Sequence, residues 1–105
     1  MVVLSTVGKA EDAERIGRAL VERGLAACVN VLPAVTSIYR WKGKVEKDEE
    51  RLLVIKTRAE RFEALRQALV SLHPYEVPEV LALPIAAGHQ PYLDWLDESV
   101  KEDGG

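Results

Sequence analysis

The chain alternates between short apolar runs of strand type and longer segments of helical periodicity, and the order of these segments constrains its fold. Val2 to Val7 is a β-branched run ended by Gly8, which predicts a buried strand. Apolar residues then recur at helical spacing up to Gly24, a residue suited to ending a helix. The same two patterns predict strands over 25–32, 35–41, 44–57 and 79–85, and helices over 62–72 and 91–100.

With 25–32 and 35–41 counted as one extended segment broken at Pro33, the order strand, helix, strand, strand, helix, strand predicts an α+β fold. It matches the ferredoxin-like split βαβ sandwich, an antiparallel sheet with helices on one face, here followed by a short C-terminal helix. Pro33 is expected to break the second extended segment, and Pro74 to end the second helix. Gly43 favours a hairpin turn between the two long arms. Without a linker or repeat, residues 1–105 are expected to form one domain.

Composition excludes several classes of function. The apolar share of 48% and the charged share of 30% are typical of a soluble globular protein. A net charge of −3 argues against a nucleic-acid binder, and no apolar run is long enough for a membrane span. The single cysteine, Cys28, cannot form an intramolecular disulfide, so we expect a cytoplasmic protein.

Two common functions of the ferredoxin-like plan fit the sequence poorly. An RNA-recognition module needs aromatic and basic residues on its central strands, whereas Val2 to Val7 and Leu52 to Ile55 are aliphatic. An acylphosphatase-like enzyme needs a glycine-rich, basic loop after the first strand. Here that loop contains Glu11 and Asp12, which would repel an anion.

The predicted hairpin carries two large aromatic side chains. Alternation along 36–41 places Tyr39 and Trp41 on one face with Ser37, and Ile38 on the other. The second arm, from Lys44, is long and begins with a run of charges. Those charges could guard an open sheet edge. We favour an arm that pairs with a neighbouring subunit and buries both aromatics, because aromatics are enriched in interfaces.

The segment His73-Pro74-Tyr75-Glu76-Val77-Pro78-Glu79 combines an imidazole, a phenol and two carboxylates on backbone that cannot be helical. His73 has a structural interpretation as the end of the second helix, where a charged imidazole interacts favourably with the helix dipole. The cluster is also a candidate functional site.

Five segments in order resemble a known family: Gly24–Asn30, Ser37–Gly43, Lys56-Thr57, His73–Glu79 and Tyr92–Leu96. Together they are similar to the CutA family of divalent-cation tolerance proteins, over nearly the whole chain. The resemblance implies a ferredoxin-like homotrimer with paired hairpins and a PII-like architecture. It also implies a cytoplasmic role in tolerance of copper or other divalent metals, without an established reaction.

The candidate metal ligands are few. Copper and zinc prefer thiolate and imidazole ligands, and the chain offers only Cys28, His73 and His89. In family members with proposed metal ligands, the ligands are a thiol in the first strand and a pair of adjacent histidines. In this chain the corresponding positions are Ser5 and Leu72-His73. His73 is therefore the main metal candidate. Cys28 is a second candidate, although we expect it to be a small buried core residue.

Two hypotheses follow. The preferred one is a trimeric binding or signalling protein whose clefts between protomers hold a metal ion or a small effector; the residues expected to line these clefts are Trp41, Lys56, His73, Tyr75 and Glu76. The alternative is an enzyme with His73 as general base, oriented by Glu76 or Tyr75. No nucleophile or phosphate-binding loop accompanies that base, so we expect no enzyme.

Overall fold

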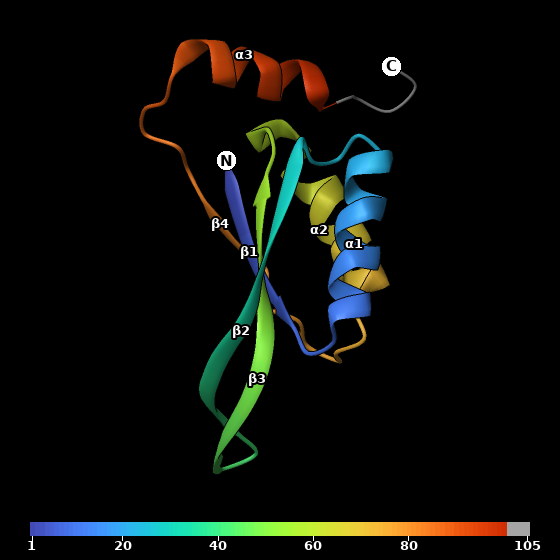
Figure 1. Ribbon diagram of the computed structural model, residues 1–105, viewed down its shortest axis with the longest axis vertical. Helices are drawn as coiled ribbons and strands as arrows, with labels where there is room; N and C mark the ends of the chain where they lie inside the picture. The colour runs from blue at the N-terminus through green and yellow to red at the C-terminus, as the bar shows by residue number, and fades with distance from the viewer. Residues whose placement is uncertain (101–105) are drawn as a thin grey trace.

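The computed structural model describes residues 1–100 and shows a four-stranded antiparallel sheet with two helices on one face (Figure 1). The strand order is β2-β3-β1-β4, which confirms the predicted ferredoxin-like plan. The elements are β1 (Val2–Val7), α1 (Ala10–Glu22), β2 (Cys28–Trp41), β3 (Lys44–Lys56), a 3₁₀ turn (Ala59–Arg61), α2 (Phe62–Leu72), β4 (Leu81–Leu83) and α3 (Gln90–Ser99).

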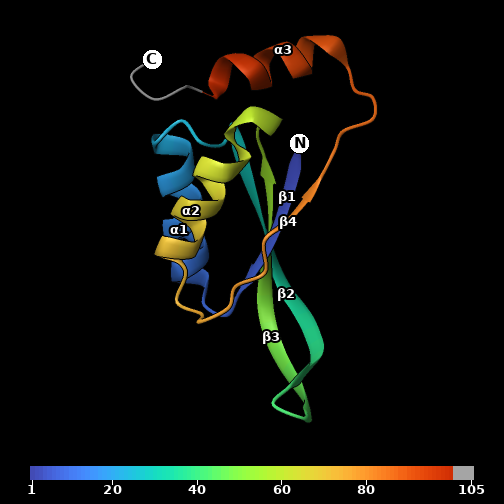
Figure 2. The same cartoon turned by 180° about the vertical axis from the view of Figure 1, so that it is seen from behind.

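The core lies between the sheet and the helix pair α1 and α2. Residues of β1 and β3 alternate, so that Val3 and Val7 face the helices together with Leu53 and Ile55. Helix α1 comes close to β2 at Gly17, where an added Cβ would lie 3.2 Å from a methyl group of Val29. The two helices cover only one face of the sheet, and both views show the other face without a helix over it (Figures 1 and 2).

The second strand is continuous, so the predicted break at Pro33 is wrong. The pairing of β2 with β3 shifts between Leu32 and Val35, which is a β-bulge, and Ala34 there has a φ of 57°. Proline is tolerated because β2 is an edge strand, where a missing N–H leaves no neighbour unpaired. The strand also begins at Cys28 and not at Leu25.

The bulge decides which side chains share a face. Before it, Leu32 pairs with Leu52; after it, Val35 pairs with Glu50 and Tyr39 with Glu46. Paired residues of antiparallel strands point to the same side of a sheet. The extra residue therefore brings Tyr39 to the face away from the helices. We call this helix-free side the outer face.

The C-terminal elements differ from prediction mainly in length. The strand expected over 79–85 is confined to Leu81–Leu83, and the last helix spans Gln90–Ser99. Helix α3 lies across one end of the sheet, while the β2–β3 hairpin extends past β1 at the opposite end (Figure 1). The hairpin therefore has no strand or helix of residues 1–100 beside its distal half.

One buried hydroxyl in the core predicts a stabilising substitution. Ser5 is fully buried on the helix side of β1, and its Oγ has no hydrogen-bond partner among residues 1–100. We expect Ser5→Ala to raise the free energy of unfolding by about 1 kcal/mol, because it removes an unsatisfied polar group. Urea unfolding at a fixed protomer concentration measures the difference.

A second buried hydroxyl provides the control with the opposite sign. Thr57 donates from Oγ1 to the carbonyl oxygen of Leu25 at 2.6 Å and is also fully buried. Thr57→Val keeps the shape but removes that donor, so we expect a loss of about 1 kcal/mol or more. A destabilising effect of Ser5→Ala would contradict the expectation for Ser5.

Candidate functional site

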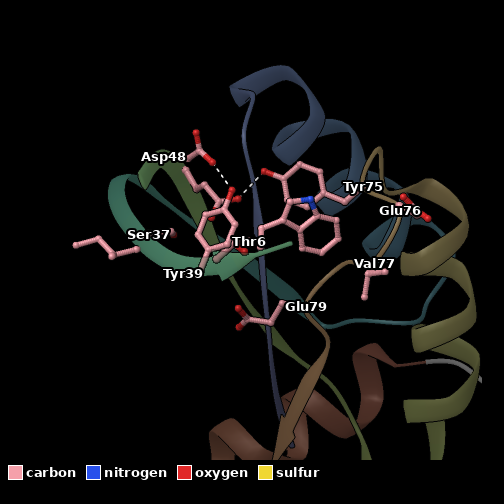
Figure 3. Close-up of a pocket in the computed structure, with 11 residues that line it drawn as sticks. Thr6, Ser37, Tyr39, Asp48, Tyr75, Glu76, Val77 and Glu79 are labelled. Carbon is pink, nitrogen blue, oxygen red and sulfur yellow. Dashed lines mark hydrogen bonds between the residues drawn. The ribbon is translucent and has the colours of Figure 1, made fainter. Parts of the chain in front are cut away.

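A pocket of about 600 Å³ opens on the outer face, where the hairpin continues past the end of β1. Tyr39 and Trp41 from β2 and Asp48 and Glu50 from β3 form one side of it. The segment after α2 forms the other side, with Tyr75 in contact with the hairpin (Figure 3). We call this cavity the outer pocket.

Two phenol–carboxylate pairs organise the outer pocket. Tyr39 donates a short hydrogen bond to Asp48 Oδ2, and Tyr75 donates to Glu50 Oε2 at 2.5 Å (Figure 3). The hydrogen bond to Asp48 raises the pKa of Tyr39 to about 12. Burial, followed by the hydrogen bond to Glu50, raises the pKa of Tyr75 well above its usual value. Both phenols therefore act as neutral donors that hold carboxylates in the pocket.

This arrangement predicts a late phase in the alkaline titration of the protein. Because folding raises the pKa of Tyr39 from 10.0 to about 12, its stabilising bond is complete below pH 10 and is lost as the pH rises through 12. Tyrosinate absorbance of the folded protein should therefore rise later than that of the urea-unfolded protein. Tyr39→Phe should remove part of the late phase.

Tyr92→Phe is the matched control, because Tyr92 lies on α3 and does not line the outer pocket. It should leave the late phase intact. If Tyr39→Phe and Tyr92→Phe gave the same titration curve, the bond between Tyr39 and Asp48 would not exist in solution.

His73 contacts two residues that line the outer pocket, Thr6 and Tyr75, and is only 7% exposed. Its Nδ1 accepts a hydrogen bond from the backbone N–H of Tyr75 at 3.1 Å, and its Nε2 donates to the carbonyl oxygen of Thr6 at 2.8 Å. This pattern assigns the neutral tautomer with the proton on Nε2. His73 does end α2, as expected, but the charged imidazole expected there is wrong.

The same two bonds argue against the metal-binding and base roles expected for His73. A metal ligand needs a free nitrogen lone pair, and the lone pair of Nδ1 is taken by Tyr75. A general base needs the same lone pair. The ring is also stacked at a tilt on Tyr75, with centroids 4.6 Å apart. His73 thus positions Tyr75 and joins the end of α2 to β1.

The five residues predicted to line one cleft are only partly together. Trp41, Tyr75 and Glu76 line the outer pocket, and His73 does not line it but is bonded to Tyr75. Glu76 points away from the two tyrosine hydroxyls (Figure 3). Lys56 lies at the far end of β3, six residues or roughly 20 Å from Glu50, with its Nζ 5.8 Å from the ring centroid of Tyr92.

Cys28 is not a core residue, which corrects the sequence-based expectation. It is half-buried on the outer face, where it pairs with Lys56, while the next residue, Val29, packs against the core. Its Sγ lies 3.7 Å from Asn30 Oδ1. Within residues 1–100, no group of three or more His, Cys, Asp or Glu side chains is placed to hold a metal ion.

Sequence reasoning missed the carboxylates that matter most. Asp48 and Glu50 stand in the run of charges at the start of the second arm, for which two roles were considered, a guard for an open sheet edge and, preferred, part of an arm that pairs with a neighbouring subunit. Their spacing of two puts them on one face of β3, with Asp48 paired to Ser37 across the hairpin. The same alternation that grouped Ser37 with Tyr39 could have identified them.

The centre of the outer face is apolar and uncovered by the protein's own helices. There, Leu4 pairs with Val54 on one side and with Leu81 on the other. Leu32, Leu81 and Leu83 are 41%, 57% and 49% exposed. Among residues 1–100, no helix has the length and apolar character needed to cross a membrane.

Known proteins resemble the chain closely. The family model described as "CutA1 divalent ion tolerance protein" matches residues 1–99. The "Divalent-cation tolerance protein CutA" of Thermus thermophilus is 55% identical over 98 residues, which cover 93% of this chain and 95% of the relative. A solved structure from the same organism, described as "Divalent cation tolerance protein (Cut A1)", has a TM-score of 0.93 at 54% identity, covering 95% of this chain and 97% of that chain.

Other relatives differ in length and compartment. The rice protein "Protein CutA 1, chloroplastic" is 45% identical over 102 residues, and the match covers 97% of this chain but 58% of the relative. A 40% identical structure from Archaeoglobus fulgidus, with a TM-score of 0.92 over 95% of this chain and 97% of that chain, is described as periplasmic. The expected cytoplasmic location gains no support from these names. None of these relatives is named as an enzyme.

Proposed function

Because the chain belongs to the CutA1 divalent ion tolerance protein family, we propose that it serves the response to divalent cations as a homotrimer with ligand-binding clefts between protomers. The observation that carries this proposal is the outer pocket at the border of an uncovered apolar sheet face. A face of this kind on a small protein is typical of an interface.

The hairpin supports the assembly. Its distal half has no neighbouring element among residues 1–100, and Tyr39 and Trp41 are 40% and 44% exposed there. Packing against a second protomer would remove both rings and the apolar centre of the outer face from water. The outer pocket would then lie in a cleft between protomers. Lys56 belongs to that cleft only if a different protomer supplies it.

The side chains of one protomer support direct copper binding less well than they support the binding of a small effector. Both nitrogens of His73 are engaged, and Cys28 stands on the outer face without a second thiol or imidazole beside it in the described part of the chain. Soft metals require several thiolate or imidazole ligands. The residues of a single protomer therefore do not fit a tight copper site, and a metal ion would need ligands from more than one protomer. A small effector in the outer pocket is the form of the proposal that the geometry favours.

Two measurements test the proposal. Light scattering in dilute buffer should give three times the protomer mass of 11.7 kDa, and a protomer-sized mass would overturn the trimer with every cleft that depends on it. Equilibrium dialysis against Cu²⁺ and Zn²⁺ should give the same stoichiometry for wild type and His73→Ala. A loss of bound metal in His73→Ala alone would restore His73 as a ligand.

A further inference from the structure

Glu50 is a buried carboxylate without a counter-charge. It is only 6% exposed, and Tyr75 donates a hydrogen bond to its Oε2. Within residues 1–100, no lysine or arginine forms an ion pair with it, and its Oε1 accepts no hydrogen bond. Buried carboxylates are ordinarily paired with a cation. Glu50 therefore presents one oxygen that the protein itself leaves to another partner.

The surroundings of Glu50 favour a positive partner. Glu50 lines the outer pocket together with Asp48, Glu76 and Glu79, and no lysine, arginine or histidine of residues 1–100 lines it. Its walls include the rings of Tyr39, Tyr75 and Trp41. Aromatic faces attract cations, and the Lys42 ammonium already lies 5.8 Å from the ring centroid of Trp41.

The size and the ligand set favour an organic cation over a metal ion. The volume of about 600 Å³ is that of a small-molecule site and far exceeds the space that a single ion needs. In the described part of the chain, the acidic side chains do not form a three-ligand cluster. The free Oε1 of Glu50 calls for a hydrogen-bond donor, which ammonium and guanidinium groups supply.

We propose that the outer pocket binds a small organic cation, an ammonium or guanidinium group on an apolar chain, with its charge paired to Glu50 and its body against the aromatic walls. The inference rests on the proposed function in taking the outer pocket as the effector cleft. It names the chemical class of the effector, which the proposed function leaves open.

The probe is agmatine, which carries a guanidinium and an ammonium group at the two ends of a butyl chain. In isothermal titration calorimetry, agmatine should bind the full-length protein, whereas adipate, a dianion with the same four-carbon spacer between its charged groups, should not. Glu50→Gln keeps the size of the side chain and an acceptor for Tyr75 but removes the charge. This substitution should weaken the binding of agmatine at least about tenfold.

Glu11→Gln is the matched control, because Glu11 is an exposed acid on α1 that does not line the pocket. It should leave the affinity for agmatine unchanged. Trp41→Leu should also weaken the binding of agmatine, because it removes the aromatic face. The leucine keeps an apolar side chain at the same position. Light scattering of every variant shows whether the assembly persists.

The outcomes separate this inference from the proposed function. Equal binding to wild type and Glu50→Gln, or no binding of agmatine or putrescine at about 1 mM, would overturn the cation site while the trimer stands. If Glu50→Gln instead dissociated the assembly and no probe bound, a basic side chain of a second copy would occupy the pocket, and the small-cation site would be overturned. Binding that depends on Glu50 in a protein of protomer mass would leave the cation site standing and overturn the trimer.

Discussion

Replacing His73 by alanine should lower the free energy of unfolding by about 3 kcal/mol, because two backbone groups lose their side-chain partner in a nearly closed site. The carbonyl oxygen of Thr6 loses a donor at 2.8 Å, and the N–H of Tyr75 loses an acceptor at 3.1 Å. The variant also leaves a cavity under the ring of Tyr75. Urea unfolding at one protomer concentration measures the loss.

Two further variants divide that loss between the two bonds. His73→Asn places an amide oxygen near the position of Nδ1, and His73→Gln places an amide nitrogen near that of Nε2. Each should recover part of the stability, because each retains one of the two bonds. The experiment is run with a chelator present. If wild type and His73→Ala then unfolded at the same urea concentration, His73 would have no structural role.

The element order was predictable because it depends on local periodicity. The apolar spacing of α1 and α2 and the alternation in β1 are visible without knowledge of neighbouring segments. Pro33 was misjudged because its effect depends on whether β2 lies at an edge or in the middle of the sheet. That position follows from the order β2-β3-β1-β4, which is a tertiary property.

The face of Cys28 shows a second limit of sequence reasoning. Both faces of β2 carry apolar residues, with Val29 and Val31 on one and Leu32 on the other. Alternation groups the residues but does not say which group packs against a helix. The close approach of Gly17 to Val29 decides it, and this contact joins segments twelve residues apart.

Some residues that line the candidate site could be predicted from the sequence, whereas the bonds of His73 and the burial of Glu50 could not. Trp41, Tyr75 and Glu76 were expected in one cleft, and they line the outer pocket. The bonds of His73 were not predictable, because a histidine near carboxylates suggests chemistry, whereas its two nitrogens are satisfied by backbone groups of Thr6 and Tyr75. Thr6 is far from His73 in the sequence, and the bond to Tyr75 uses its backbone N–H, which no side-chain pattern reveals. The burial of Glu50 is likewise not visible in the sequence.

Leu32→Glu should convert the proposed trimer into protomers. Leu32 lies on the outer face, paired with Leu52, and is 41% exposed in the isolated chain. A carboxylate there remains in water in the protomer, so the fold should persist. In the trimer it would be buried without a partner in each of three symmetric contacts, at a cost of about 3–5 kcal/mol for each charge.

Val70→Glu is a closely matched control, because Val70 is an apolar residue of α2 that is 40% exposed on the helix side of the sheet. Light scattering should give the protomer mass for Leu32→Glu and the wild-type mass for Val70→Glu, while circular dichroism shows that both are folded. The introduced charge and the exposure of the replaced side chain are alike, while Leu32 stands on the outer face and Val70 on the helix side of the sheet. Equal masses for the two variants would mean that the outer face is not the surface through which protomers associate.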